Sequence, residues 1–200
     1  MTRGPAKQFD TEVALTKAME VFWARGYEAA SLSELLKTMG IGKKSLYDTF
    51  GNKRSLFLKS LEHYAQTTIR EMRDRISTDG SPEGSPLENL KQLFLEWQET
   101  HSQPRSCGCM FGTNIADFNT DDAEIAKVMR GYLRQMEDVF YTALTRAQKA
   151  GELSPAISPR DQARRLLCTA QGLALIGRVM EDDTTLAGAV QAEFSLLEGS

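Results

Sequence analysis

Apolar residues recur at steps of three and four along most of the chain, which is the period of an amphipathic α-helix. After Asp10, which is placed to cap a first helix, such positions are Val13, Ala14, Ala18, Val21 and Phe22. A second stripe comprises Ile125, Met129, Tyr132, Met136, Val139 and Ala143. Because the strict alternation of a half-buried strand is almost absent, the pattern predicts an all-α fold.

Two short helices and a tight turn are predicted near the N-terminus. Ser31 and Glu34 have the spacing of a capping box, which predicts a helix over residues 32–39. The glycine-rich segment 40–42 supplies a turn, and a second helix follows from about 43 to 49. This arrangement is typical of a helix-turn-helix.

Longer helices are predicted for the rest of the chain. They span residues 53–77, 87–101, a segment from a cap at Asp121 to Ala150, 159–180 and 184–197. Between the first two, STDGSPEGSP (77–86) is predicted to be a loop because it has nothing to bury.

Charge is distributed unevenly. Residues 1–60 hold ten Lys or Arg against six Asp or Glu, and residues 61–200 hold 14 against 21, within a net charge of −3. A basic segment on an acidic body is expected when one end of a protein binds phosphates. Since no apolar run reaches about 18 residues and no signal peptide is recognisable, we expect a cytoplasmic protein without a membrane partner.

The second helix of the predicted helix-turn-helix has two faces. Leu46 and Phe50 lie four residues apart and are expected to pack inward. The outer face then carries lysines that can reach guanine edges or phosphates, and hydroxyls that can donate to phosphates in the major groove. The candidate DNA contacts are Ser31, Gly42, Lys43, Lys44, Ser45, Tyr47 and Lys53.

One stretch carries a family signature, ALTKAMEVFWARGYEAASLSELLKTMGIGKKSLYDTFGNKRSLF, residues 14–57. It resembles the DNA-binding head of the TetR family of one-component repressors. The matching positions are Phe22, Gly26, Tyr27, Ser31, Leu35, Gly40, Tyr47, Phe50, Lys53 and Leu56. Asp48 and Lys44 depart from the usual pattern of that family.

The resemblance implies an all-helical homodimer with a three-helix head, a linking helix and a larger helical body. Residues 1–52 would form the DNA-binding domain, and 53–200 the effector-binding and dimerisation domain. The implied function is that of a repressor released from double-stranded palindromic operator DNA by a small-molecule effector, whose identity the sequence does not reveal.

A stripe of small residues on the segment 159–180 is a candidate dimer interface. It comprises Ala163, Leu167, Ala170, Ala174 and Gly177. Small residues let two helix backbones approach closely, and a helix-turn-helix reads palindromes through a two-fold axis. Packing on the preceding helix within the same chain fits the stripe equally well.

An effector cavity between body helices is expected. Its candidate lining residues are Trp97, His101, Met110, Phe111, Asn114, Phe118, Met136, Phe140 and Gln171. Periodicity does not separate the lining of a cavity from the filling of a core. The polar members, His101, Asn114 and Gln171, are the stronger candidates because a buried polar group needs a partner.

Cys107 and Cys109 offer an alternative function. Arg105 and a nearby helix start would lower a thiol pKa, which would favour sensing of electrophiles or oxidants. The two thiols are also compatible with an inert buried pair, or with a soft-metal site completed by His101.

Enzyme motifs are missing from the sequence. There is no H-E-x-x-H motif, Walker loop, G-x-S-x-G elbow or dinucleotide fingerprint, so neither catalysis nor a cofactor is predicted. A dimeric helical adaptor without DNA binding is a further alternative, and it would lack the steep salt dependence of a DNA binder.

Overall fold

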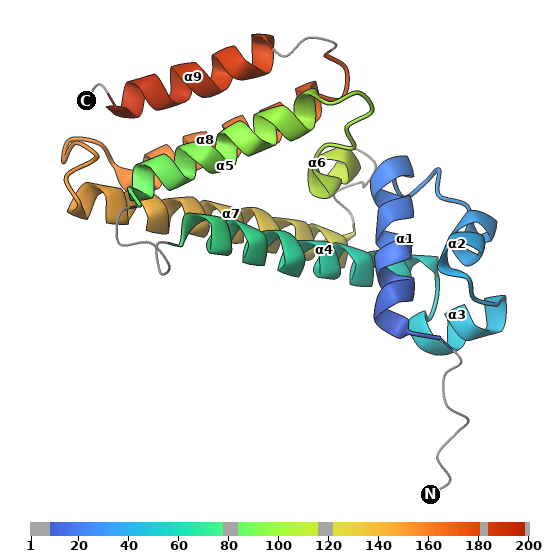
Figure 1. Ribbon diagram of the computed structural model, residues 1–200. Coiled ribbons are helices and arrows are strands. Elements are labelled where there is room, and N and C mark those ends of the chain that lie inside the picture. Colours follow the sequence, from blue (N-terminus) through green and yellow to red (C-terminus); the bar gives the residue numbers. More distant parts are fainter. Residues whose placement is uncertain (1–8, 78–83, 116–121, 181–183, 199–200) are drawn as a thin grey trace, which may run out of the picture.

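The computed structural model describes residues 9–77, 84–115, 122–180 and 184–198. These residues form nine α-helices and no strand, as the periodicity predicts (Figure 1). The helices are α1 (Thr11–Arg25), α2 (Leu32–Met39), α3 (Lys43–Phe50), α4 (Lys53–Ile76), α5 (Pro86–Ser102), α6 (Met110–Ile115), α7 (Ala123–Lys149), α8 (Pro159–Ile176) and α9 (Thr184–Glu198).

Local capping determines where the first helices begin and end. The Asp10 carboxylate accepts hydrogen bonds from two backbone N–H groups in the first turn of α1. Ser31 Oγ accepts from the N–H of Glu34 at 3.1 Å. Gly40 ends α2 with a φ of 69°, a left-handed conformation that favours glycine. The predicted helix-turn-helix is therefore confirmed.

The head formed by α1, α2 and α3 is held to α4 by buried apolar side chains. Leu46 and Phe50 of α3 are buried, as predicted. Phe22 of α1 is fully buried and meets Phe57 of α4 edge to face, with ring centroids 5.0 Å apart. Burial of each such side chain contributes roughly 1.5–3 kcal/mol, so the recognition helix is positioned by the same core as α1 and α4.

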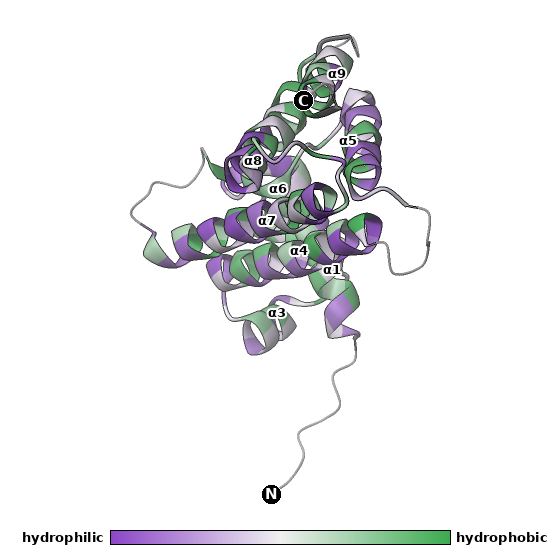
Figure 2. Ribbon diagram, turned by 90° about the vertical axis from the view of Figure 1, so that its left-hand side faces the viewer, coloured by the Kyte–Doolittle hydropathy of each residue, from purple (hydrophilic) through white to green (hydrophobic). Residues whose placement is uncertain are grey.

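The body consists of α4 to α9. Helices α4 and α7 begin side by side next to the head and run away from it in the same direction, and α8 packs on α7 (Figure 1). Hydrophilic and hydrophobic residues alternate along these helices, as expected where each buries one face (Figure 2). No helix within the described ranges is long and apolar enough to cross a membrane.

Two predicted helix ends require correction. Asp122 rather than Asp121 caps α7, because its carboxylate accepts from the N–H of Ile125; Asp121 lies outside the described residues. Helix α8 ends at Ile176 rather than near Met180, since Gly177 occupies its C-cap.

The small residues of α8 pack inside the chain, which corrects their prediction as a dimer interface. Ala163, Ala170 and Ala174 are at most 4% exposed, and Leu167 is partly buried against the same core. A Cβ at Gly177 would lie 2.6 Å from the carbonyl oxygen of His101, so this glycine allows α8 to approach α5. The close approach that such residues permit is used within one chain.

An ion-pair cluster joins the starts of α4 and α7. Arg54 forms a bidentate pair with Asp122, with N···O distances of 2.8 and 2.7 Å, and its third nitrogen lies 2.9 Å from Glu124. The Arg54 guanidinium holds the pKa of Asp122 at about 2, below its ordinary value. Since Asp122 also caps α7, one carboxylate serves both helices.

Replacing Asp122 with Asn tests this joint, because asparagine still caps a helix but carries no charge. A carboxylate whose folded pKa is depressed stabilises the fold fully above its unfolded pKa, and this contribution is lost as pH falls toward about 2. We therefore expect Asp122→Asn to lower the urea unfolding midpoint at about pH 7 and to have less effect at about pH 3.

A matched control is Glu96→Gln, which breaks a more exposed single pair with Arg75. Its effect at neutral pH is expected to be smaller than that of Asp122→Asn. Identical midpoints for Asp122→Asn and the unmodified protein at neutral pH would contradict a role for the ion pair in stability.

Candidate DNA interface and ligand cavity

The recognition helix α3 exposes one face to solvent. Lys43 and Lys44 are exposed, and Tyr47 retains 48% of its accessible surface. The opposite face is anchored in the core, so the exposed face has a fixed orientation. Gly42 caps α3 without a side-chain hydrogen bond, which leaves N–H groups of the first turn open to a phosphate.

The remaining predicted DNA contacts flank this face. Ser31 is exposed at the start of α2, and Ser45 is partly buried on α3. The Lys53 ammonium lies 4.5 Å from the centroid of the Tyr27 ring and donates to the carbonyl of Glu28 at 3.4 Å. An ammonium has more donors than this contact uses, so Lys53 is held in place and still able to meet a phosphate.

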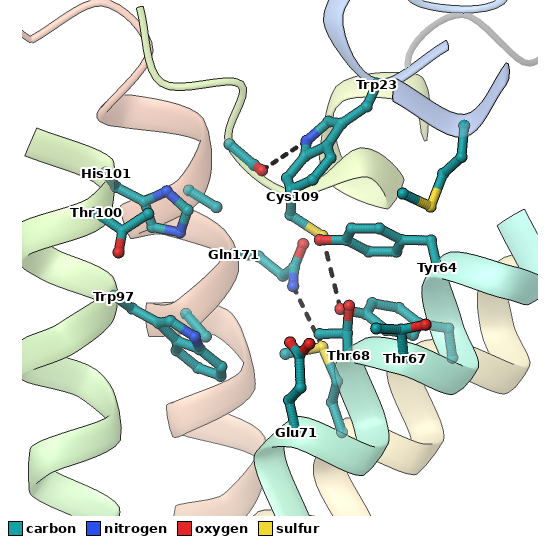
Figure 3. Close-up of a pocket in the computed structure, with 16 residues that line it drawn as sticks. Trp23, Tyr64, Thr67, Thr68, Glu71, Trp97, Thr100, His101, Cys109 and Gln171 are labelled. Atoms are coloured by element: carbon teal, nitrogen blue, oxygen red, sulfur yellow. Dashed lines mark hydrogen bonds between the residues drawn. The ribbon is translucent and has the colours of Figure 1, made fainter. Parts of the chain in front are cut away.

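A cavity of about 440 Å³ lies between the head and the body (Figure 3). Helices α1, α4, α5, α7 and α8 and the loop before α6 contribute to its wall. The lining residues are Met19, Trp23, Tyr64, Thr67, Thr68, Glu71, Trp97, Thr100, His101, Gly108, Cys109, Tyr132, Met136, Ala170, Gln171 and Ala174. Its size and its mixture of apolar walls with a few polar groups are typical of small-molecule sites.

Burial keeps several titratable groups of the wall uncharged. It lowers the pKa of His101 and raises the pKa of the Tyr64 and Tyr132 hydroxyls well above the ordinary value. At neutral pH the imidazole and both phenols are therefore neutral.

The two predicted sensor thiols occupy different environments. Cys109 is buried, and its Sγ lies 3.9 Å from the Tyr132 hydroxyl in the cavity wall. Cys107 is partly buried on the preceding loop. No group of three or more metal-ligating side chains occurs within the described ranges, so nothing in the structure supports the metal hypothesis.

Two hydrogen bonds connect the head directly to the body, and the first of them reaches the cavity wall. The Trp23 indole N–H, from α1, donates to the carbonyl of Gly108 at 2.8 Å (Figure 3). The backbone N–H of Tyr27 donates to Asn114 Oδ1 of α6 at 3.1 Å. A head helix therefore forms part of the cavity and is bonded to the loop that closes it.

Comparisons with known proteins agree with this architecture. The family model for bacterial regulatory proteins of the tetR family matches residues 14–59, and the model for the tetracyclin repressor-like C-terminal domain matches residues 86–192. The HTH-type transcriptional regulator YezE of Bacillus subtilis (strain 168) is 32% identical over 197 residues, which are 98% of this chain and 100% of YezE. The chain belongs to the TetR family.

A further curated relative and a solved structure are similar over most of their length. The HTH-type transcriptional repressor ComR of Escherichia coli (strain K12) is 28% identical over 88% of this chain and 83% of ComR. A cysteine variant of the TetR family regulator CifR, solved in complex with 26-base-pair operator DNA, has a TM-score of 0.82 and 26% identity, with 96% of this chain and 98% of CifR covered.

As a TetR family member, the chain is a DNA-binding transcriptional regulator and not an enzyme. This assignment argues against the alternative of an adaptor without DNA binding.

The structure brings together only part of the predicted effector set. Trp97, His101, Met136 and Gln171 line the cavity. The others do not. Met110, Phe111 and Phe140 are fully buried core residues, and Phe118 lies outside the described residues. Asn114 is also buried, but its amide is satisfied within the chain by Tyr27 and by the Met110 carbonyl, so it needs no ligand.

Sequence reasoning missed the contribution of α1 and α4 to the cavity. Trp23 and Met19 belong to the head, and the predicted cavity lining included no head residue. On α4, Tyr64, Thr68 and Glu71 recur at helical spacing and form a mixed polar stripe, a signal that could have identified this wall.

Lys44→Ala tests whether the exposed face of α3 reads sequence. If Lys44 donates to a base edge, its loss is expected to weaken binding to a selected operator by about tenfold or more and to weaken binding to random duplex much less. Fluorescence anisotropy on both duplexes measures the difference. Lys149→Ala, at the end of α7, is a control in which one lysine is lost from the body. Equal losses on both duplexes would show that Lys44 contacts only phosphate.

Proposed function

We propose that this protein is a dimeric, ligand-responsive repressor that a small molecule in the cavity releases from its operator. The observation that carries the proposal is the position of Trp23. It belongs to the DNA-binding head, lines the cavity and is hydrogen-bonded to Gly108 in the loop before α6, which also lines the cavity. A ligand that fills the cavity therefore contacts the head itself, as well as the linking helix α4.

Release follows from the geometry of two heads on one duplex. In the DNA-bound state the α3 helices of the two subunits enter successive major grooves, about 34 Å apart. A ligand that moves α1 and α4 relative to the body changes this spacing. Only a difference in ligand affinity between the two conformations drives the change, and such couplings are typically about 1–3 kcal/mol.

An operator partner is supported by the CifR complex with operator DNA and by the ComR repressor. Selection of genomic fragments by the purified protein would identify the operator. Failure to retain any duplex at low ionic strength would contradict the proposed function.

The dimer interface is proposed to be the outer face of α8. Leu175 and Ile176 are 57% and 42% exposed, and Val179, just after the helix, is 77% exposed. Large apolar side chains with this exposure are the kind that a two-fold interface buries. They replace the inward-facing alanines as the candidates.

Introducing Glu at both Leu175 and Val179 is expected to convert the dimer to a monomer in analytical ultracentrifugation, because two like charges would be buried against their symmetry mates. Val13→Glu, an equally drastic change at a 51% exposed position of α1, serves as the control. A doubly substituted protein that sediments as the unmodified dimer would rule out this interface.

Tryptophan fluorescence tests the link between cavity and DNA. The chain has two tryptophans, and both line the cavity, so Trp97→Phe leaves Trp23 as the reporter. We expect the Trp23 emission to shift when operator is added, because coupling between two sites is reciprocal. Trp23→Phe, which retains Trp97, is the companion variant. If Trp23 emission stays constant at saturating operator, the proposed route of coupling is wrong.

Thiol sensing is a second candidate, favoured by the location of Cys109 in the cavity wall beside Tyr132. An electrophile that enters the cavity would meet this sulfur. If the thiols sense, alkylation by N-ethylmaleimide should weaken operator binding, and Cys107→Ser or Cys109→Ser should abolish the response. Unchanged operator affinity after full modification of both thiols would exclude sensing by this route.

A further inference from the structure

Among the described residues that line the cavity, one side chain is acidic, Glu71, and it is also exposed to solvent. Glu71 projects into the cavity from α4 (Figure 3). The described lining residues include no lysine and no arginine, and burial lowers the pKa of His101 so that it does not supply a positive charge. A carboxylate or phosphate ligand would therefore lose its hydration without gaining a cationic partner.

A buried acceptor in the same wall has no donor. Gln171 Oε1 is buried and has no hydrogen-bond partner among the described residues. The amide nitrogen of Gln171 donates only weakly, to the sulfur of Met136 at 3.6 Å. Since a thioether is a poor acceptor, rotation of this amide toward the cavity costs little. A buried carbonyl oxygen without a donor is unfavourable, and a ligand N–H would relieve this cost.

Aromatic rings supply the apolar part of the wall. Trp23, Trp97 and Tyr64 enter from α1, α5 and α4 (Figure 3). Tyr132 of α7 also lines the cavity. Trp23 packs edge to face on Tyr64, with centroids 5.1 Å apart, and Trp97 packs on Phe94 at 5.3 Å. The faces of rings held in this way can stack on a flat apolar ligand. They also attract a cation through the ring quadrupole.

We propose that the effector is an arylalkylamine, a protonated amine linked to an apolar aromatic body, whose N–H groups meet Glu71 and Gln171 Oε1. This inference rests on the proposed function, because it names the ligand class of the same cavity. The assignment follows from an acidic group, an unpaired acceptor and aromatic walls in one cavity whose described lining residues include no lysine or arginine. It predicts that, among ligands of the same shape, the cavity binds a cationic one more tightly than a neutral or an anionic one.

Three probes with one aromatic body test this. Biphenylethylamine carries a cation with N–H donors, and biphenylethanol carries a neutral O–H donor. Biphenylpropionate carries an anion. Calorimetric titration into the DNA-free protein measures their dissociation constants. We expect the amine to bind at least about tenfold more tightly than the propionate, with the alcohol between them. Equal or tighter binding of the propionate, or no binding of the amine, would overturn the proposal.

Variants identify which group discriminates. Glu71→Gln should weaken the amine severalfold and leave the alcohol unchanged, whereas Gln171→Leu should weaken both. Glu62→Gln, on an exposed position of α4 outside the cavity wall, should change neither. An amine affinity that Glu71→Gln leaves unchanged would also overturn the proposal.

The DNA-free titration separates this inference from the proposed function. If the cavity binds the amine more tightly than the propionate but the amine does not release operator, the ligand class is supported and ligand-responsive repression is contradicted. Release of operator by the propionate but not by the amine would support a responsive regulator and overturn the ligand class.

Discussion

The hydrogen bond from the Trp23 indole to the Gly108 carbonyl is the constraint on which this account depends, because it joins a DNA-binding helix to the wall of a ligand cavity. Gly108 has little freedom to move. Its φ of 67° is in the left-handed region, and a Cβ there would lie 2.3 Å from the carbonyl oxygen of Ala174. The loop is therefore wedged between α8 on one side and α1 on the other, and a shift of either helix is transmitted to the other.

Two further contacts limit how the head can move. Asn114 of α6 accepts from the backbone of Tyr27, and Arg54 at the start of α4 is paired with Asp122 and Glu124 at the start of α7. These contacts surround the joint between head and body. The cavity reaches this joint through Met19 and Trp23 of α1, so a ligand there contacts the head that carries α3.

The head could be predicted from sequence because its structure is determined locally. The Ser31 cap, the left-handed Gly40 and the inward pair Leu46 and Phe50 act over a few residues, and each was found where predicted. The outer face of α3 followed from the same pattern. Its contacts with operator bases depend on a partner and stay a prediction.

The cavity could be predicted only in part because it depends on contacts between distant segments. Periodicity marks Phe111 and Trp97 alike as inward-facing, yet one fills the core and the other lines the cavity. Polarity was a better guide for Gln171 than for Asn114, whose partner, Tyr27, is 87 residues away in sequence. The small residues of α8 could not be assigned from sequence for the same reason. The spacing that includes Ala170 is identical whether the helix packs on α7 or on a second chain, and the structure shows that Ala170 is buried within the chain.

Hydrogen exchange of the two indole N–H groups, resolved by nuclear magnetic resonance, tests the central claim most directly. In the ligand-free protein the Trp23 indole should exchange far more slowly than that of Trp97, because it is bonded to Gly108. A small molecule that releases operator should abolish this protection. Equal exchange rates for both indoles, or protection of Trp23 that persists when operator is released, would contradict the claim that this bond links the cavity to DNA binding.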